Sequence, residues 1–183
     1  MILKIDLDGV LYPFVMKFRL FCEMKLSRPL PPPVHYSMWE DWGMSSTEFY
    51  DLLDEFVLER HFQTGVLPDG ADQALRVLYR KYDIHIVTAR SAVLQVGKVK
   101  TYWQIDTAIW LHENVIPHKG LHFTKQKALI PGILIDDHVG NLKEASVYGQ
   151  RAICFDQPWN QEWQGERATS WLEIADKLSK EQP

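Results

Sequence analysis

The sequence predicts an α/β protein, with a parallel sheet between two helical layers and a small helical insertion after the first strand. Short apolar stretches of strand length alternate with stretches of helix length along most of the 183 residues, a pattern typical of parallel strands joined by helical crossovers. One region departs from it, because prolines at positions 29 and 31–33 separate two helical stretches with no strand between them. We expect residues 1–12 and 66–183 to form the α/β core and residues 13–65 to form the insertion.

The insertion is expected to hold two helices. Residues 14–26 are apolar on nearly every side, and only Lys17, Arg19 and Glu23 form a polar edge. The second helix begins at a capping box, in which Ser45 and Glu48 satisfy each other's free backbone amides. The apolar residues that follow have the spacing of an amphipathic helix, so we expect this helix to bury one face.

The core elements follow in a regular order. Four strands are predicted, at residues 2–5, 84–87, 133–135 and 152–155. Four helices are predicted, at residues 71–82, 91 to about 113, 141–148 and, after a second capping box at Ser170 and Glu173, through residue 178.

Composition excludes several classes of protein. Twenty basic and 24 acidic side chains give a net charge of −4, which disfavours a sequence-blind nucleic-acid binder. No uncharged apolar run reaches the roughly 20 residues that a membrane-spanning helix needs, and the charged N-terminus is unlike a signal peptide. Cys22 and Cys154 lie in apolar runs and are interpreted as buried reduced thiols. We expect a cytoplasmic protein.

Polar side chains gather where three predicted strands end. Asp6 and Asp8 follow the first strand, Thr88 ends the second, and Asp136 and Asp137 end the third. In an open α/β sheet, ligands bind at the carboxyl ends of the strands, so these groups should converge. Several carboxylates at one edge repel unless a cation lies between them, and an all-oxygen donor set is what Mg²⁺ prefers. The sequence therefore predicts a Mg²⁺ site.

A carboxylate-held Mg²⁺ commonly serves phosphate chemistry. Asp6 and Asp8 can supply a nucleophile and a general acid/base, Thr88 can supply hydrogen-bond donors, and either Lys125 or Lys127 can supply positive charge. Taken one at a time, these residues also fit turns, helix caps and ordinary strand ends.

The ordered set resembles a known family. Residues 6–10 (Asp-Leu-Asp-Gly-Val), Thr88, a lysine and the pair Asp136 and Asp137 resemble the four motifs of haloacid dehalogenase-like phosphohydrolases. The resemblance implies a three-layer Rossmann-like core with a helical cap after the first strand. It implies that Asp6 forms an aspartyl-phosphate, that Asp8 is the acid/base, and that Thr88 and the lysine hold the phosphoryl group. It also implies that Asp6, the Asp8 carbonyl and Asp136 ligate Mg²⁺, with Asp137 beside them.

A closer resemblance is to the 5′(3′)-deoxyribonucleotidase branch. It rests on residues 6–14, 123–127, 134–137, 155–160 and 171–174. The branch has its lysine in a Thr-x-x-Lys pattern, which favours Lys127 over Lys125, and it has an aromatic residue against the base where Phe14 stands. The chain departs from the branch at Ala89 and Arg90, where a Ser-Pro-type continuation is usual.

Several further residues are candidates for substrate binding. Trp39 can stack on a nucleobase or pack inside the insertion. Phe62, just before the chain returns to the core, can face the site or pack in the core. Arg90 can clamp a phosphate or form a surface ion pair, and Ala89 lies beside it. Three late tryptophans are interpreted as packing of the last strand and helix: Trp159, Trp163 and Trp171.

The sequence thus predicts a Mg²⁺-dependent phosphomonoesterase that acts on nucleoside 5′-monophosphates. A phosphatase of a small phosphosugar or another metabolite is an alternative, and a non-catalytic phospho-acceptor domain is an alternative of another class. The expected partner is a small phosphomonoester, with a nucleotide favoured, and not a nucleic-acid polymer or a membrane; association into a homodimer stays open.

Overall fold

The computed structural model of the chain describes residues 1–90 and 97–180. Its centre is a parallel sheet with the strand order β3-β2-β1-β4-β5-β6. The strands are β1 (Ile2–Ile5), β2 (Asp83–Thr88), β3 (Gly120–Phe123), β4 (Ile133–Asp136), β5 (Ala152–Phe155) and β6 (Arg167–Ala168). The order reverses at β1, which lies between β2 and β4, so the chain has its topological switch point at the end of β1.

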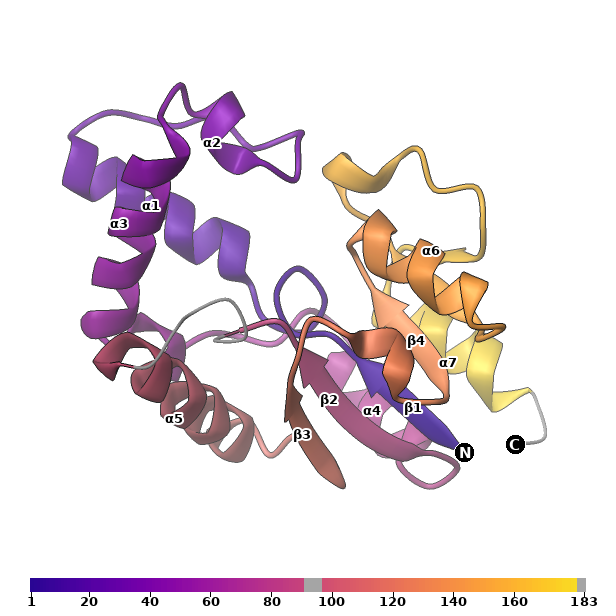
Figure 1. Cartoon of the computed structure of the whole chain (residues 1–183). Helices are drawn as coiled ribbons and strands as arrows, with labels where there is room; N and C mark the ends of the chain where they lie inside the picture. The colour runs from indigo at the N-terminus through magenta and orange to yellow at the C-terminus, as the bar shows by residue number, and fades with distance from the viewer. Residues whose placement is uncertain (91–96, 181–183) are drawn as a thin grey trace.

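Helices cover both faces of this sheet. The α-helices are α1 (Phe14–Leu26), α2 (Met38–Asp41), α3 (Ser46–Leu58), α4 (Ala71–Leu78), α5 (Lys98–Glu113), α6 (Val139–Val147) and α7 (Trp171–Ser179). Short 3-10 helices are η1 (His61–Gln63), η2 (Lys127–Leu129) and η3 (Pro158–Asn160). In Figure 1, α6 lies in front of the sheet and α4 and α7 lie behind it, as the predicted three-layer α/β fold requires.

The central strands are buried because both faces of the sheet are covered. Leu3, Ile5, Leu134 and Ile135 have no exposed surface. Continuous apolar runs of this kind are typical of parallel strands between helical layers. The strands therefore give the residues at their carboxyl ends a rigid support.

Four of the helices, α1, α2, α3 and η1, form a separate group beyond the carboxyl ends of the strands, which we call the inserted helices (Figure 1). Aromatic side chains fill their interior, with the Phe18 ring 5.1 Å from Phe49 and 5.4 Å from Phe56 in edge-on packing. The predicted helix at residues 14–26 is confirmed. The capping box is confirmed too, because Ser45 and Glu48 exchange both hydrogen bonds.

The predicted strands are confirmed, but the edge strands β3 and β6 were not predicted. β3 has four half-buried residues and β6 has only two residues, so neither shows the apolar run or the alternation that marks a strand. β3 and β6 form because the backbone N–H and C=O groups at the outer edges of β2 and β5 are available for pairing.

Helix boundaries differ from the predictions in three places. Helix α4 ends at Leu78 rather than residue 82, because the chain must turn before Asp83 pairs with Met1. Helix α6 begins at Val139, two residues earlier than expected. Helix α5 begins at Lys98, and the earlier part of the predicted helix, residues 91–96, lies outside the described residues. Among the helices described, none is long and apolar enough to cross a membrane.

Candidate active site

The carboxyl ends of β1, β2 and β4 bring the predicted polar residues together. Asp6 directly follows β1, Thr88 ends β2, and Asp136 ends β4. The Asp6 amide donates a hydrogen bond to the Ile135 carbonyl at 3.0 Å, which continues the β1–β4 pairing up to the acidic residues. Asp6, Thr88 and Asp136 are all buried, so they form a desolvated polar centre at the switch point of the sheet.

Lys127 is the lysine that enters this centre. Its Nζ lies 2.8 Å from Asp6 Oδ1 and 2.7 Å from Asp136 Oδ2, and the side chain is 1% exposed. Burial alone would lower the pKa of Lys127, but the two carboxylates outweigh it and raise that pKa, so the ammonium stays charged. Lys125 is exposed, two residues away on the other side of the turn into η2.

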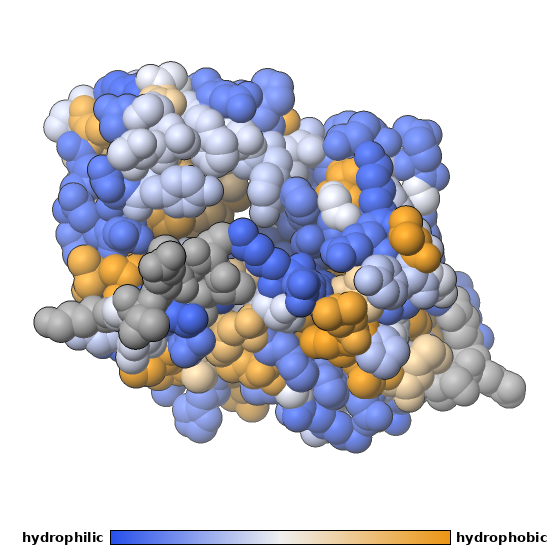
Figure 2. All heavy atoms as spheres, in the orientation of Figure 1, coloured by the Kyte–Doolittle hydropathy of each residue, from blue (hydrophilic) through white to orange (hydrophobic). Residues whose placement is uncertain are grey.

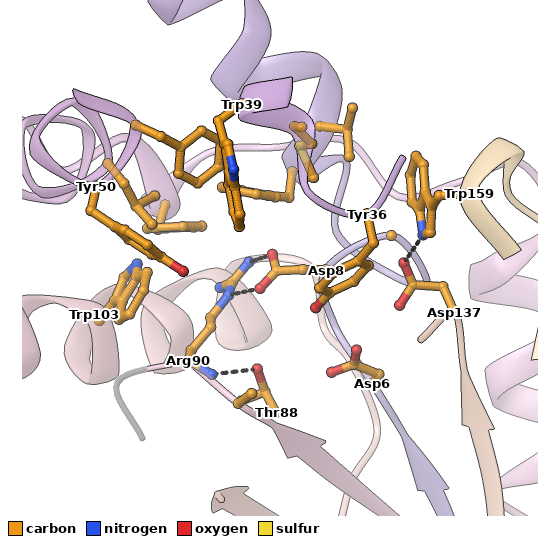
Figure 3. A pocket seen from close by; sticks show the side chains of 18 residues that line it. Asp6, Asp8, Tyr36, Trp39, Tyr50, Thr88, Arg90, Trp103, Asp137 and Trp159 are labelled. Atoms are coloured by element: carbon orange, nitrogen blue, oxygen red, sulfur yellow. Dashed lines mark hydrogen bonds and ion pairs between the residues drawn. The ribbon is translucent and has the colours of Figure 1, made fainter. Parts of the chain in front are cut away.

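Asp136 and Asp137 have different surroundings although they are adjacent. Asp136 is fully buried and accepts hydrogen bonds from Lys127 Nζ, from the His138 amide at 2.8 Å and from Asn141 Nδ2 at 3.1 Å. Asp137 instead lines the cavity above the strand ends, where its Oδ2 accepts a hydrogen bond from the Trp159 indole at 2.9 Å (Figure 3).

The acidic centre carries more negative than positive charge. Asp6, Asp136 and Asp137 offer carboxylate oxygens within 4.8 Å of one another, and Lys127 is the ammonium that pairs with two of them. Desolvation raises the pKa of Asp6 to about 7, and Lys127 only partly offsets it. Desolvation and then the neighbouring carboxylates raise the pKa of Asp137 well above its usual range. The raised pKa values show that ionising these carboxylates together is unfavourable unless a cation lies among them, so this oxygen donor set fits a divalent cation such as Mg²⁺.

Asp8 is paired with Arg90. Arg90 Nε lies 2.8 Å from Asp8 Oδ2, and its Nη2 lies 2.6 Å from Oδ1, so the contact is bidentate. Figure 3 shows both side chains at the centre of the cavity floor. The structure therefore shows the ion pair with an acidic residue that was one of the two interpretations of Arg90. The pair does not lie on the surface, because the arginine side chain is buried and only the Asp8 side chain is partly exposed.

A cavity of about 860 Å³, its open mouth included, lies between the acidic centre and the inserted helices. Figure 2 shows the surface hollowed between the upper part of the molecule and the core, with hydrophilic residues at the rim. The candidate substrate residues all line this cavity: Phe14, Trp39, Phe62, Ala89 and Arg90.

The cavity also contains aromatic residues that were not among the predicted substrate-binding residues, namely Tyr36, Phe49, Tyr50, Trp103 and Trp159. The interpretation of Trp159 as packing of the last strand was incomplete, because its indole holds Asp137. The Phe155-Asp-Gln-Pro-Trp159 segment belongs to the quoted resemblance, and that could have pointed to Trp159.

Tyr36 comes from the proline-rich loop of the insertion and crosses to the core. Its ring lies 4.2 Å from the His138 ring, and in Figure 3 its hydroxyl points toward Asp6. Desolvation in the cavity and nearby carboxylates, Asp137 first, raise the pKa of this hydroxyl, so it stays a neutral donor. No periodicity in the sequence marks Tyr36, since it lies in an irregular loop.

Comparison with known proteins now decides the family. The family described as 5′ nucleotidase, deoxy (Pyrimidine), cytosolic type C protein matches residues 1–182. The chain belongs to this nucleotidase family. It is therefore an enzyme of the phosphatase and nucleotidase class, as the ordered motifs indicated.

Solved structures agree on the fold of this nucleotidase-family chain. A haloacid dehalogenase-like hydrolase from Streptococcus pneumoniae is 15% identical with a TM-score of 0.65, and the match covers 97% of each chain. A subfamily IA hydrolase of the same superfamily from Geobacter sulfurreducens is 15% identical with a TM-score of 0.61, covering 97% of this chain and 95% of that one. A Bacillus subtilis hydrolase of the superfamily, described as bound to magnesium, is 16% identical with a TM-score of 0.55, covering 97% and 98%. No curated protein matches the chain.

Proposed function

We propose that this enzyme is a Mg²⁺-dependent phosphomonoesterase that transfers the phosphoryl group of a nucleoside 5′-monophosphate first to Asp6 and then to water. The arrangement of Asp6 carries this proposal. Lys127 holds Oδ1 at 2.8 Å, while Oδ2 accepts no hydrogen bond from the residues that the structure describes. A buried carboxylate with one fixed oxygen and one free oxygen, at the floor of a cavity, suits a nucleophile.

Asp6 and Asp137 would hold Mg²⁺ together with the Asp8 backbone carbonyl. Both carboxylates line the cavity, whereas Asp136 lies behind them and already accepts hydrogen bonds from three groups. We therefore assign Asp137 rather than Asp136 as the second carboxylate ligand, and Asp136 as the residue that fixes Lys127. When bound, Mg²⁺ neutralises charge on the phosphoryl oxygens.

The remaining steps use side chains of this chain. Asp6 forms an oxygen–phosphorus bond as the ester bond to the leaving oxygen breaks, and Asp8 gives that oxygen a proton. Asp8 then takes a proton from a water molecule that attacks phosphorus, and the bond to Asp6 breaks. The Thr88 hydroxyl, which accepts a hydrogen bond from the Arg90 amide at 3.1 Å, and Lys127 would hold the phosphoryl oxygens.

Residues 13–65 would serve as a cap over the reacting groups, with residues 1–12 and 66–183 as the catalytic core. Phe14, Trp39 and Tyr50 come from this segment and form one side of the cavity. The structure of the Bacillus subtilis relative is described as showing interdomain movement, which is consistent with a mobile cap in this superfamily. A closed cap would exclude water from the phosphoryl group.

The aromatic cavity wall favours a nucleoside over a simple sugar as the leaving group. Aromatic side chains dominate its upper part: Phe14, Tyr36, Trp39, Phe49, Tyr50, Phe62 and Trp103. Bases stack on such surfaces, whereas a phosphosugar needs several polar partners for its hydroxyls. The family description adds a preference for deoxy-pyrimidine nucleotides and a cytosolic location, which we propose for this chain.

Phosphate release from a panel of phosphomonoesters tests the proposal. The panel contains deoxy- and ribonucleoside 5′- and 3′-monophosphates and several sugar phosphates, each with Mg²⁺ and with a chelator. We expect Mg²⁺-dependent turnover that is greatest on deoxynucleoside 5′-monophosphates and is abolished in Asp6→Asn. Faster turnover of a sugar phosphate than of any nucleotide would change the assigned substrate class from nucleotides to sugar phosphates. No turnover of any ester would overturn the proposal as a whole.

A further inference from the structure

The Asp8 carboxylate is held by one side chain. Arg90 meets both carboxylate oxygens, at 2.8 Å through Nε and at 2.6 Å through Nη2. The side chain of Arg90 is 1% exposed, whereas that of Asp8 is 29% exposed and lines the cavity. The arginine thus approaches Asp8 from the protein interior, and the carboxylate keeps its open side toward the substrate space.

The guanidinium is itself fixed from three directions. Its carbon lies 4.3 Å from the centre of the Tyr12 ring and 4.2 Å from that of Phe62, and Nη1 donates to Thr107 Oγ1 at 3.0 Å. Thr107 is buried on α5 and donates its own hydroxyl to the Trp103 carbonyl at 2.7 Å. Every nitrogen of the guanidinium therefore has a partner in the protein.

Tyr12 and Phe62 lie at the two connections where the chain enters and leaves the inserted helices. Tyr12 lies just before α1, and Phe62 lies in η1. The Tyr12 hydroxyl bridges the two connections by donating to the His61 and Thr64 carbonyls, at 3.0 and 2.9 Å. Arg90 is thus held where the inserted helices join the core.

We propose that Arg90 is a positioning residue that orients the Asp8 carboxylate for proton transfer to the leaving oxygen, and that it does not bind the substrate phosphoryl group. This inference rests on the proposed function, in which Asp8 is the acid/base. A planar guanidinium fixes the plane of a carboxylate that it meets with two hydrogen bonds, which a single ammonium cannot do. Each Asp8 oxygen retains a lone pair outside the ion pair, so the carboxylate can still take up and deliver a proton.

The leaving group of the substrate distinguishes positioning of Asp8 from binding of phosphate. An alkyl leaving oxygen, as in a nucleoside 5′-monophosphate, needs a proton from Asp8, whereas p-nitrophenolate leaves without one. The informative quantity is the rate of leaving-group release in a single turnover with enzyme in excess, because it reports the first step alone. The variants are Arg90→Met, which keeps the apolar stem, and Arg90→Lys, which keeps the charge without the fork.

We expect Arg90→Met to slow release from the nucleotide on the order of 100-fold, the usual scale of general acid catalysis, while p-nitrophenol release stays within about threefold of wild type. Arg90→Lys should lose about tenfold on the nucleotide, because one hydrogen bond to Asp8 survives. Asp8→Asn combined with Arg90→Met should be no slower on the nucleotide than Asp8→Asn alone. Retained p-nitrophenol release also shows that the variants fold.

Arg76→Met is the matched control, since Arg76 is an exposed arginine paired with Asp72 on α4, and it should leave both rates unchanged. Equal losses of Arg90→Met on the two substrates, with weaker saturation, would overturn the inference in favour of direct phosphate binding. Additive losses of Asp8→Asn and Arg90→Met would overturn it as well. A wild-type enzyme inactive on both esters would instead be a failure of the proposed function.

Discussion

At the scale of single residues, Gly9 in the turn after Asp8 lies directly against Asp137. Its φ is +79°, in the left-handed region, and a Cβ built there would lie 2.3 Å from Asp137 Oδ2. A methyl group at this position cannot coexist with the observed Asp137 side chain. Gly9 is therefore required twice, by the turn after Asp8 and by the carboxylate that we assign to Mg²⁺.

We predict that Gly9→Ala displaces Asp137 and lowers Mg²⁺-dependent turnover by ~10- to 100-fold, the range found when groups supporting a metal site are disturbed. The measurement is phosphate release as a function of Mg²⁺ concentration. Gly43→Ala is the matched control, because Gly43 has a similar φ of +61° but no atom within 4 Å of a built Cβ. It should cost only about 1 kcal/mol of stability, from backbone strain. Equal loss of turnover in both variants would contradict this explanation.

At the scale of elements, an ion pair between a partly exposed arginine and a buried aspartate fastens the end of the inserted helices to α5. Asp106 on α5 is fully buried, and Arg60, which precedes η1, donates to its two oxygens at 2.8 and 3.0 Å through Nε. Gln63 Nε2 adds a hydrogen bond at 3.1 Å, and the Arg60 guanidinium carbon lies 4.5 Å from the centre of the Tyr102 ring. The position of η1 therefore depends on this pair.

We predict that Arg60→Met lowers the free energy of unfolding by more than Arg76→Met does, because it removes the guanidinium that donates to the buried Asp106 carboxylate and leaves Gln63 as the remaining donor among the described residues. Equilibrium unfolding in urea measures this change. The same substitution at Arg76, whose pair with Asp72 is exposed, should cost less than about 1 kcal/mol. A loss at Arg60 as small as that at Arg76 would show that the pair contributes little.

The strands β2 and β3 carry a histidine pair whose charge depends on pH. His85 Nδ1 lies 2.9 Å from His122 Nε2, and the two ring planes are nearly parallel, at 13°. Desolvation, followed by the neighbouring His122, lowers the pKa of His85. The unfolded chain, in which His85 titrates near its ordinary value, therefore binds a proton at a higher pH than the folded protein does.

It follows that the folded state loses stability as the pH falls through about 6.5, the value for an unperturbed histidine, and continues to lose it down to the lowered pKa of His85. We predict that His122→Gln weakens this loss between pH 7.5 and 5.5, measured as the difference in urea unfolding free energy. His112→Gln, at an exposed position on α5, is the control and should keep the wild-type difference. If the unfolding free energy of His122→Gln depends on pH as the wild type does, the histidine pair is not the cause of that dependence.

At the scale of the whole molecule, the excess negative charge at the switch point makes stability depend on a cation. Asp6, Asp136 and Asp137 are buried together beside the Lys127 ammonium, and desolvation raises the pKa of Asp6 and of Asp137. A cation that binds only the folded state stabilises it by about 2.7 kcal/mol at 100 times its dissociation constant. The site and the global fold are therefore thermodynamically linked.

We predict that MgCl₂ raises the midpoint of thermal unfolding relative to NaCl of equal ionic strength, and that Asp137→Asn removes most of this rise. Asp176→Asn, which changes an exposed carboxylate on α7, should leave the rise intact. Calorimetry or circular dichroism gives the midpoints. A wild-type protein indifferent to MgCl₂ would contradict the assignment of a Mg²⁺ site, and an undiminished rise in Asp137→Asn would move the ligand role to another residue.

The fold and the gathering of polar residues could be predicted from the sequence, because both depend on local patterns. The capping box at Ser45 lies within four residues, and the strand at residues 2–5 shows in its own apolar run. The rule that parallel strands bring their carboxyl ends together then places Asp6, Thr88 and Asp136 at one edge without any further information.

Partners across the fold required the tertiary structure. Lys125 and Lys127 differ by two positions in the sequence, yet only Lys127 is buried between Asp6 and Asp136. The sequence left open whether Arg90 contacts phosphate or pairs with an acid, and the structure shows a pair with Asp8, held by packing against Tyr12 and Phe62.

The amino-acid sequence by itself thus determined the fold class, the family and the set of residues at the strand ends. Tertiary structure alone decided which of Asp136 and Asp137 faces the cavity, which aromatic residues line it, and which arginine holds Asp8. The physical reason is that periodicity and capping act over a few residues, whereas the direction and burial of a side chain depend on groups that are far away in the sequence. Lys4 Nζ, for example, donates a hydrogen bond to the carbonyl of Lys127, 123 positions further along the chain.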